Sequence, residues 1–431
     1  YTLMNQEFIR KKYAVDTIGW INGDYYLPQL KENHYFVNLA SGYGSRGDKE
    51  KEIELFTELV NQKSYLALGY VIGIAGILLP LLNLDNFVIY AGGRTGAGKS
   101  TVSFLALSLF GNYEMLKATN DNATVGFELF LKQRNHTLAV LDEVNTSVGD
   151  VEKVAENLVR NIYKFSGKQG RYRANTDITL REQVRFEGML YVSAEDDLKT
   201  FLKLNKRTVK GVLRRTILID FEKLYQSWGG EENLQSWAEM VYSVIKENYG
   251  NMLGDIVEKI KSDMDKIKED YKNYIGYYKD IDQGWQFEGQ ERALALLCTA
   301  TRFLERHTGL DFGFMFELID EIATLNNSEF NKGVRATKED LIEEIEAWIS
   351  ENYGFFKVTQ TREEEVERYD ESGQKKKERK VVEATEKQPV KALFGKIEDQ
   401  KLFLTNIGLT SLAKYLQMSE MELKRTIAEF G

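Results

Sequence analysis

The sequence predicts an α/β fold, in which helices cover both faces of a mostly parallel sheet. Two observations predict it. Between residues 86 and 221, four apolar runs of strand length alternate with helical or loop segments, and a glycine-rich loop joins the first run to an apolar helical pattern. The four runs are Phe87 to Ala91, Thr137 to Leu141, Gly188 to Ser193 and Arg215 to Phe221.

The composition is typical of a soluble globular protein. The chain has 431 residues, enough for two or three domains, of which 43% are hydrophobic and 29% charged. A single cysteine, Cys298, excludes an internal disulfide bond and is typical of the reducing cytoplasm, where we expect the protein. With one cysteine and three scattered histidines, the sequence offers no zinc-ligand spacing.

Changes of pattern along the chain predict four parts. Residues 1–50 alternate aromatic and polar residues with glycines, which predicts a small β-containing element. Residues 51–221 contain the strand runs and form the predicted α/β core, and residues 222–331 have the apolar spacing of a helical lid. Residues 332–431 differ in character and predict a separate C-terminal domain.

The predicted C-terminal domain contains two further features. Residues 361–391 are almost wholly polar, with an acidic block before a basic one, which predicts a mobile hairpin or a disordered insert. The last residues predict two short helices joined at Met418-Ser419, as in a helix-turn-helix. Two ordinary surface helices explain this pattern equally well.

An uncharged run from Ser64 to Leu84 is nearly long enough to span a bilayer, and it contains a G-x-x-x-G pair, Gly69 and Gly73. Pro80 interrupts the run, no basic flank marks a cytoplasmic side, and a predicted strand follows at once. We therefore expect a helix buried against the sheet and no membrane partner.

The loop after the first strand matches a phosphate-binding motif. Residues 93–100, GRTGAGKS, fit G-x-x-x-x-G-K-[ST] between a strand and a helix, the context that this motif requires. We expect Lys99 to contact the β- and γ-phosphates and Ser100 to bind magnesium, so the predicted cofactors are ATP and Mg²⁺. The residues expected to contact the nucleotide are Gly93, Arg94, Thr95, Gly96, Ala97, Gly98, Lys99, Ser100 and Thr101.

Two carboxylates follow the second strand. Asp142 and Glu143 come directly after the apolar run LAVL. We expect Asp142 to lie near magnesium and Glu143 to polarise a water molecule for in-line attack. Two acids after an apolar run are common where a strand enters a solvated loop, but downstream of a phosphate loop they predict the second half of one site.

The third strand brings Ser193 and Glu195 to the edge of the sheet at which ligands bind. Ser193 could hold the attacking water or contact the γ-phosphate. A serine at a strand end is also an ordinary turn residue, which is the alternative.

Arg214 and Arg215 stand at the start of the fourth strand. A nucleotide buried between subunits needs a cation from the neighbour, and the planar, permanently charged arginine suits this role. We favour Arg215, with Arg214 as the alternative; a solvated rim position for both is the other interpretation.

A basic region begins between the second and third strands and extends to the start of the fourth. Residues 164–215 contain thirteen Lys or Arg against six Asp or Glu, although the net charge of the chain is −9. Two strand-capable arms flank a glycine-containing tip, which predicts an inserted β-hairpin that contacts a nucleic-acid backbone, or a solvated charged hairpin. The predicted contact residues lie at this tip, between the second and third strands: Lys168, Arg171, Tyr172 and Arg173.

Seven segments occur in a fixed order over roughly residues 15–310: TIGWINGDYYLP, AGGRTGAGKST, ALSLFGNYEMLKATNDNATVGFE, LAVLDEV, YKFSGKQGRYR, YVSAEDDL and GVLRRTILID. Together they resemble a family of phage and mobile-element proteins long classed as a domain of unknown function. Proteins of this family look like AAA+ replicative helicases related to the minichromosome-maintenance type, and they occur on cassette-chromosome and pathogenicity-island elements.

The resemblance implies an AAA+ P-loop core with an inserted hairpin and a helical lid, assembled as a hexameric ring around DNA with ATP between neighbours. It makes Ser193 a sensor of the γ-phosphate, Arg215 a finger reaching the neighbouring subunit, and the basic hairpin a DNA contact in the pore. It also implies a second sensor arginine in the lid, for which Arg292 and Arg302 are the candidates. A winged-helix C-terminal domain is expected by analogy.

We therefore expect an ATP-dependent replicative DNA helicase of mobile-element type that translocates on single-stranded or forked DNA, with a primase or an initiator as a further partner. The alternative is an AAA+ ATPase that remodels or loads a protein, or that binds an origin without unwinding it. The cations around Tyr172 favour the helicase, because a remodeller's pore loop usually has an exposed hydrophobic tip.

Overall fold

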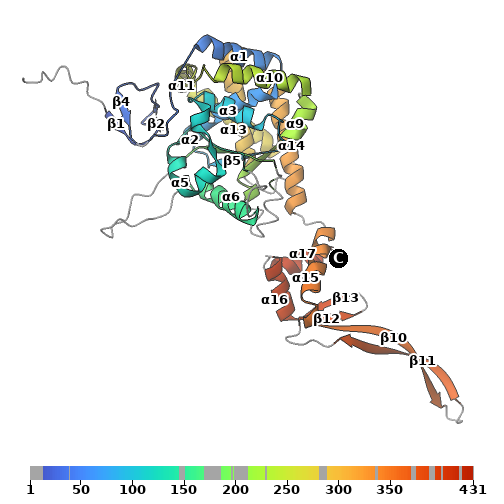
Figure 1. Cartoon of the computed structure of the whole chain (residues 1–431). Coiled ribbons are helices and arrows are strands. Elements are labelled where there is room, and N and C mark those ends of the chain that lie inside the picture. Colours follow the sequence, from blue (N-terminus) through green and yellow to red (C-terminus); the bar gives the residue numbers. More distant parts are fainter. Residues whose placement is uncertain are drawn as a thin grey trace, which may run out of the picture. The chain divides into compact units, whose positions relative to one another are not determined.

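The computed structural model divides the chain into two compact units, Tyr1–Asn331 and Lys332–Gly431 (Figure 1). It describes residues 13–37, 39–144, 151–168, 186–195, 198, 212–228, 231–280, 289–334, 338–369, 375–387, 394–398, 401–416 and 420–430.

The first unit is built on a five-stranded, fully parallel sheet in the order β6-β7-β8-β5-β9. The predicted mixed α/β class with a parallel sheet is confirmed, and the short edge strand β6 is an addition that sequence did not predict. All residues of β5 from Phe87 to Ala91 are buried, because both faces of this interior strand are covered. The strands are β5 (Phe87–Gly92), β6 (Ala118–Thr119), β7 (Leu138–Asp142), β8 (Met189–Ser193) and β9 (Thr216–Asp220).

Parallel pairing places the carboxyl ends of all five strands at one edge of the sheet. In the register, Ala91 of β5 lies opposite Ser193 of β8, and Leu141 of β7 lies opposite Val192 of β8. The residues that follow β5, β7 and β8 therefore meet at one edge, while the segment that leads into β9 lies at the opposite edge.

The uncharged run forms α2 (Leu68–Leu81), which is buried along almost its whole length. Its small residues let it approach α3 (Lys99–Ser108) closely: a Cβ on Gly69 would lie 2.6 Å from the carbonyl oxygen of Val102. The glycine pair thus serves helix packing inside the core. In the part of the chain that the structure describes, no helix is both long and apolar enough to cross a membrane.

The edge strand β9 is covered by helices that follow it in sequence. Asn326 of α14 (Gly313–Val334) accepts from the N–H of Leu218 at 2.8 Å and donates to its carbonyl at 2.7 Å. Gln290, the first residue of α13 (Gln290–Thr308), donates to the carbonyls of Leu213 and Thr216 at 2.8 and 2.9 Å. These side chains satisfy strand-edge groups that would otherwise be buried without partners.

The single cysteine lies in this helical layer. Cys298 of α13 is buried, and its Sγ lies 3.3 Å from the hydroxyl of Tyr278 in α12 (Met264–Asp280). Burial raises the pKa of the Cys298 thiol to about 12, so the group is protonated at neutral pH.

Two small sheets precede the core: β1 pairs with β4 in parallel, and β2 pairs with β3 as an antiparallel hairpin. The other elements among the described residues of the first unit are β1 (Tyr13–Val15), β2 (Gly19–Ile21), β3 (Asp24–Tyr26), β4 (His34–Phe36), α1 (Lys49–Asn61), η2 (Tyr65–Ala67), α4 (Tyr113–Leu116), α5 (Asn120–Lys132), α6 (Val151–Ser166), α9 (Phe221–Trp228), α10 (Glu231–Ile245) and α11 (Leu253–Ser262).

In the part of the second unit that the structure describes, a four-stranded sheet in the order β11-β10-β12-β13 is combined with three α-helices. Most of the predicted insert 361–391 lies in β10 and β11, which pair as a long antiparallel hairpin. The centre of the predicted helix pair, Met418-Ser419, lies outside the described residues. The elements are α15 (Lys338–Glu351), η3 (Tyr353–Phe355), β10 (Phe356–Tyr369), β11 (Lys375–Lys387), β12 (Gly395–Glu398), β13 (Lys401–Leu404), α16 (Asn406–Tyr415) and α17 (Glu420–Phe430).

Candidate functional site

The phosphate loop connects β5 to α3 at the carboxyl edge of the sheet. Gly98 has φ of 86°, in the left-handed region, and a Cβ there would lie 3.0 Å from a methyl group of Leu66 and 3.2 Å from the hydroxyl of Tyr65. Only glycine suits both restrictions. The hydroxyl of Tyr65 also donates to the carbonyl of Ala97 at 3.0 Å, and Tyr191 donates to the carbonyl of Lys99 at 2.8 Å. The loop is therefore held from both sides.

Lys99 lies at the centre of this loop. Its ammonium donates to the carbonyls of Gly93 and Arg94, the latter at 2.7 Å. Burial lowers the pKa of Lys99, and the nearby carboxylates of Glu195 and Asp142 oppose that effect. An anionic ligand in the loop would stabilise the charged ammonium further, which is the behaviour expected of a phosphate-binding lysine.

Asp142, the last residue of β7, joins three parts of the site. Its Oδ1 accepts from the hydroxyl of Ser100 at 2.8 Å and from that of Ser193 at 2.7 Å, and its Oδ2 lies 3.4 Å from the ammonium of Lys117. The side chain is almost fully buried. A serine hydroxyl and a carboxylate side by side are oxygen ligands of the kind that Mg²⁺ prefers, so the predicted pair Ser100 and Asp142 fits that ion.

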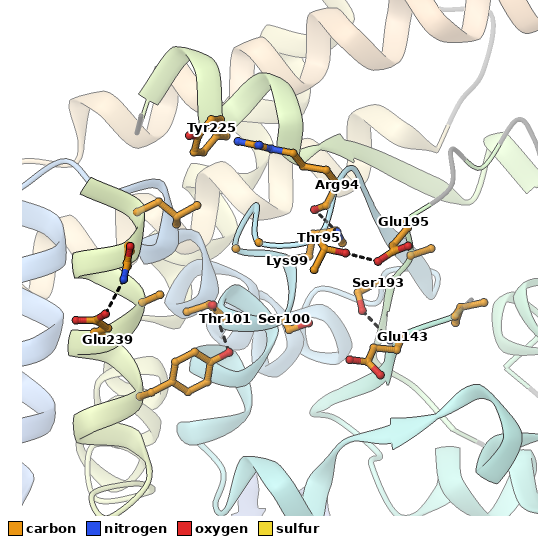
Figure 2. Close-up of a pocket in the computed structure, with 18 residues that line it drawn as sticks. Arg94, Thr95, Lys99, Ser100, Thr101, Glu143, Ser193, Glu195, Tyr225 and Glu239 are labelled. Carbon is orange, nitrogen blue, oxygen red and sulfur yellow. Dashed lines mark hydrogen bonds between the residues drawn. The ribbon is translucent and has the colours of Figure 1, made fainter. Parts of the chain in front are cut away.

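Glu143 follows with an unusual backbone. Its φ is 56°, in the left-handed region, which costs a non-glycine residue about 1 kcal/mol or more. Its N–H donates to the hydroxyl of Ser193 at 3.0 Å, so the neighbouring strand holds this conformation. The turn directs the exposed carboxylate into the cavity above the loop (Figure 2).

The third strand supplies two further groups. Ser193 is buried and contacts both acidic residues, as a donor to Asp142 and as an acceptor from Glu143. Glu195, two residues further on, accepts from the hydroxyl of Thr95 in the phosphate loop. Hydrogen bonds thus connect the loop, the acidic pair and the third strand. Figure 2 shows the bonds between Glu143 and Ser193 and between Thr95 and Glu195.

The loop, Glu143, Ser193 and Glu195 line a cavity of about 720 Å³, and the buried Asp142 lies behind its wall. One wall consists of the loop residues and the ends of β7 and β8; the other comes from α9 and α10, which sequence reasoning did not assign to the site. Six residues form this second wall: Tyr225, Leu234, Gln235, Ala238, Glu239 and Tyr242. These six residues follow the spacing of an ordinary amphipathic helix, which does not mark them as part of a site. The one sequence feature that could have indicated their role is their position directly after the last strand.

Arg94 and Thr101 contact this second wall. The guanidinium of Arg94 lies 4.4 Å from the ring centre of Tyr225 and pairs with Glu222 at 2.9 Å. The hydroxyl of Thr101 lies 3.4 Å from that of Tyr242. Both residues were predicted to contact a nucleotide, and both line the cavity.

Arg214 and Arg215 lie at the opposite edge of the sheet, in the turn before β9, and both are exposed. They line a separate cavity of about 390 Å³ together with Arg292 and Asp85. Gln290 fixes this turn through the carbonyls of the residues on either side of the pair, Leu213 and Thr216.

The structure brings neither candidate for the second sensor to the phosphate-loop cavity of its own chain. Arg292 lies beside Arg214 and Arg215. Arg302 pairs with Glu305, donates to the hydroxyl of Tyr274 at 3.2 Å and lies 5.0 Å from the ring centre of Phe316. Arg302 is therefore engaged within the helical layer.

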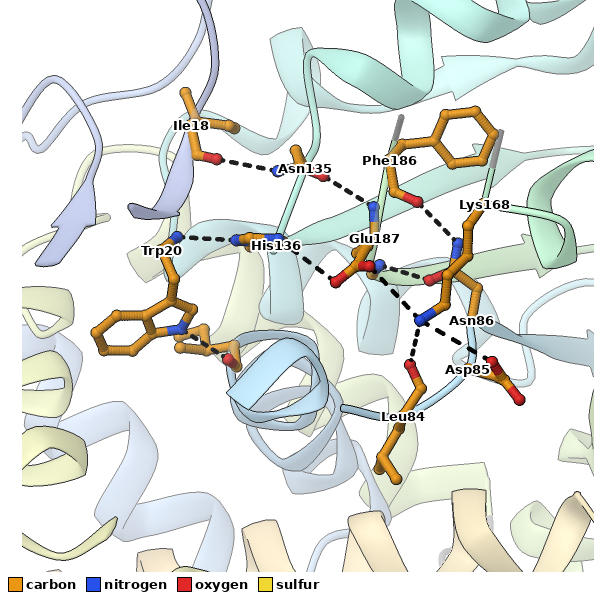
Figure 3. A network of polar contacts seen from close by, with 12 residues as sticks. Ile18, Trp20, Leu84, Asp85, Asn86, Asn135, His136, Lys168, Phe186 and Glu187 are labelled. Atoms are coloured by element: carbon orange, nitrogen blue, oxygen red, sulfur yellow. Dashed lines mark hydrogen bonds and ion pairs between the residues drawn. The ribbon is translucent and has the colours of Figure 1, made fainter. Parts of the chain in front are cut away.

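Lys168 was predicted at the tip of the basic hairpin, and this position is wrong. The ammonium donates to the carbonyl of Leu84 at 2.7 Å and lies 3.6 Å from Glu187 and 3.9 Å from Asp85 (Figure 3). Its carbonyl accepts from the N–H of Phe186 at 3.2 Å, so Lys168 lies where the two ends of the insert meet. The other predicted contacts, Arg171, Tyr172 and Arg173, lie outside the described residues.

His136 connects this network to the N-terminal element. Its Nδ1 accepts from the N–H of Trp20 at 2.8 Å (Figure 3). Its carbonyl accepts from the hydroxyl of Tyr25 at 2.7 Å. On the other side, its own N–H donates to the carbonyl of Glu187 at 2.7 Å. Burial lowers the pKa of His136 to about 4, so the ring is neutral at physiological pH with its proton on Nε2.

Comparisons with known proteins bear on the fold. A family model described as "Domain of unknown function (DUF927)" matches residues 1–185. No curated protein sequence is a match. Among solved structures, "SCCmec type IV Cch - active helicase" has a TM-score of 0.65 at 15% identity and covers 94% of this chain and 73% of that one. At this identity the likeness shows a shared fold.

Two further structures match with much lower scores. The "NrS-1 C terminal region" has a TM-score of 0.25 at 13% identity, covering 64% of this chain and 71% of that one. The "JCV Helicase" has a TM-score of 0.21 at 14% identity, covering 53% of this chain and 73% of that one. At these scores neither adds to the argument.

Proposed function

We propose that the protein is an ATP-dependent DNA helicase of AAA+ type, acting as a ring with ATP bound at subunit interfaces. The observation that carries the proposal is the contact of Asp142 with Ser100 of the phosphate loop and Ser193 of the third strand. It joins a phosphate-binding loop to a magnesium-type carboxylate and a third-strand hydroxyl in one cavity, which is the arrangement that nucleoside triphosphate hydrolysis needs.

Each residue has a definite task in hydrolysis. The loop N–H groups and Lys99 bind the phosphates, while Ser100 and Asp142 would hold Mg²⁺, which neutralises charge on the phosphate oxygens. Glu143 orients a water molecule in line with the γ-phosphate and accepts its proton. Ser193 fixes the positions of both acids, because its hydroxyl contacts Asp142 and the backbone of Glu143.

The arginines support a site shared between two subunits. Arg214, Arg215 and Arg292 line a cavity at the edge of the sheet opposite their own phosphate loop. Exposed arginines at the edge of the sheet that faces away from their own phosphate loop would act on the γ-phosphate bound by a neighbouring copy. Arg292 would then assist in trans, in contrast to a sensor that acts within its own chain.

DNA as the substrate is supported by the basic insert and by the likeness to the structure described as an active helicase. The ends of the insert are fixed to the core through Lys168 and Phe186. A movement of the core during hydrolysis would therefore reach Arg171, Tyr172 and Arg173, which we propose contact the DNA backbone. A winged-helix role for residues 332–431 belongs to the same proposal.

The test is strand displacement from a forked DNA duplex with ATP and Mg²⁺. The parent should unwind the fork, and Lys99→Ala should lose both ATP hydrolysis and unwinding. The double variant Arg171→Ala, Arg173→Ala should hydrolyse ATP without unwinding. Lys272→Ala, an exposed change on α12 away from both cavities, is the matched control and should behave like the parent.

The competing function predicts a different result. If ATP is hydrolysed at a rate indifferent to DNA and no strand is displaced, the protein is a remodeller or a loader, and the helicase proposal fails. Hydrolysis with tight binding of one duplex sequence and no displacement would instead favour an initiator.

A further inference from the structure

The cavity above the phosphate loop continues well beyond the phosphate-contacting groups. Glu143 and Ser193 lie on one side of the loop, and Glu239 of α10 lies on the other (Figure 2). The acidic pair and the third strand occupy the γ-phosphate end. The opposite end, formed by α10 and Tyr225 of α9, therefore faces the nucleoside of a bound nucleotide.

Helix α10 is close enough to the loop for this role. A Cβ on Gly98 would lie 3.3 Å from a methyl group of Leu234, and the hydroxyl of Tyr242 lies 3.4 Å from that of Thr101 on α3. Leu234 and Tyr242 thus contact the loop and the helix that follows it. If a nucleotide's phosphates occupied the loop, its ribose, the first group after the α-phosphate, would lie beside the turns of α10 between these two contacts.

Two stripes of different chemistry follow this face of α10. Leu234 and Ala238, four residues apart, present apolar surface suited to the flat face of a base. Gln235 and Glu239, also four residues apart, present polar groups. The amide of Gln235 donates to Oε1 of Glu239 at 3.0 Å, so the carboxylate is held in one orientation (Figure 2).

An ionised carboxylate accepts hydrogen bonds and donates none, so its partner must be a hydrogen-bond donor. The vicinal hydroxyls of a ribose are such a partner, and an acidic side chain performs this task in dinucleotide-binding folds. Phosphate is a poor direct partner for Glu239, because two anions repel each other unless a cation lies between them.

We propose that Glu239 binds the ribose hydroxyls of the nucleotide and, oriented by Gln235, makes the site selective for ribonucleotides over deoxyribonucleotides. The inference rests on the proposed function, since it names the substrate class of the same site. It adds a specificity-determining residue outside the motifs that bind phosphate and magnesium.

The test is calorimetric titration of the full chain with ADP, 2′-deoxy-ADP and IDP in the presence of Mg²⁺, since diphosphates are not consumed. The parent should bind ADP about tenfold more tightly than 2′-deoxy-ADP, because a hydrogen bond to a charged group is lost. Glu239→Ala should bind both with the same affinity. Ser236→Ala, an exposed change on the same helix outside the cavity lining, should retain the parent's preference.

The outcomes separate this inference from the proposed function. If the parent binds none of the three nucleotides, the proposed function fails. If the parent binds ADP and 2′-deoxy-ADP equally, or if Glu239→Ala leaves the preference intact, the ribose assignment fails while nucleotide binding stands. If Glu239→Ala changes the ratio of ADP to IDP instead, the carboxylate reads the base, and the ribose assignment is again overturned.

Discussion

Ser193 is the residue on which the geometry of both acids depends. Replacement by alanine removes a hydrogen bond to Asp142 and leaves the left-handed backbone of Glu143 without its acceptor. We expect Ser193→Ala to lower kcat for ATP hydrolysis by about 10- to 100-fold, since each lost bond to a buried polar group costs about 1–3 kcal/mol.

Affinity for ADP should change little in Ser193→Ala, because the phosphate loop is untouched. Steady-state ATPase assays and ADP titrations measure the two effects separately. Ser243→Ala, on the exposed side of α10, serves as the control. Parent-level hydrolysis by Ser193→Ala would show that the acids keep their positions without it.

His136 makes stability depend on pH. The unfolded chain protonates this histidine below its ordinary pKa of 6.5, whereas the folded chain resists protonation down to about pH 4. The stabilisation is therefore complete above pH 6.5 and is lost as the pH falls toward 4. We expect this group to lower the free energy of unfolding by about 2 kcal/mol between pH 7 and pH 5.

Urea unfolding at the two pH values measures this difference. His136→Gln should be less stable than the parent at pH 7, because the acceptor for Trp20 is altered, but its stability should fall less on acidification. His34→Gln, in the N-terminal strand β4, is the control. An identical fall for the parent and for His136→Gln would assign the pH dependence to other groups.

At the scale of elements, the packing of α2 on α3 depends on the absence of side chains. We expect Gly69→Ala to lower the free energy of unfolding by about 1–3 kcal/mol, because the new methyl group would lie 2.6 Å from the carbonyl oxygen of Val102. Gly276→Ala on α12 is the matched control, since nothing lies within 4 Å of its Cβ.

The control should be stabilised by up to about 1 kcal/mol, because alanine is the better helix former. Denaturant unfolding of both variants gives the comparison. If Gly69→Ala were stabilised as much as Gly276→Ala, α2 and α3 would have to lie further apart than the 2.6 Å between a Cβ on Gly69 and the carbonyl oxygen of Val102 implies.

The sequence predicted the strands and the phosphate loop because each depends on the residue pattern of a few consecutive positions, an apolar run or the glycine-rich motif. Asp142 and Ser193 could be placed at one edge because parallel strands end together. The wall formed by Leu234 and Glu239 could not be predicted, since amphipathic spacing does not say what a helix faces. Lys168 was misplaced because its position is decided by contacts with residues distant in sequence, such as Asp85.

At the scale of the whole molecule, the proposed assembly forms each active site from residues of two neighbouring subunits. Lys99→Ala and the double variant Arg214→Ala, Arg215→Ala should each lack ATPase activity alone. A mixture should regain part of it, because some interfaces then combine an intact loop with intact arginines. ATPase assays on the mixed and separate proteins measure this rescue.

Mixing each variant with itself at the same total concentration is the control. If the mixture is no more active than its components, the arginines act within their own chain or not at all, and the shared site is wrong.

Cys298 offers a way to observe the helical layer from outside. As the only cysteine of the chain, buried and paired with Tyr278, it is shielded from alkylating reagents while α12 and α13 stay packed together. The rate of its modification therefore reports how often that layer opens. Fluorescent labels can be attached at new surface cysteines without first replacing the native one.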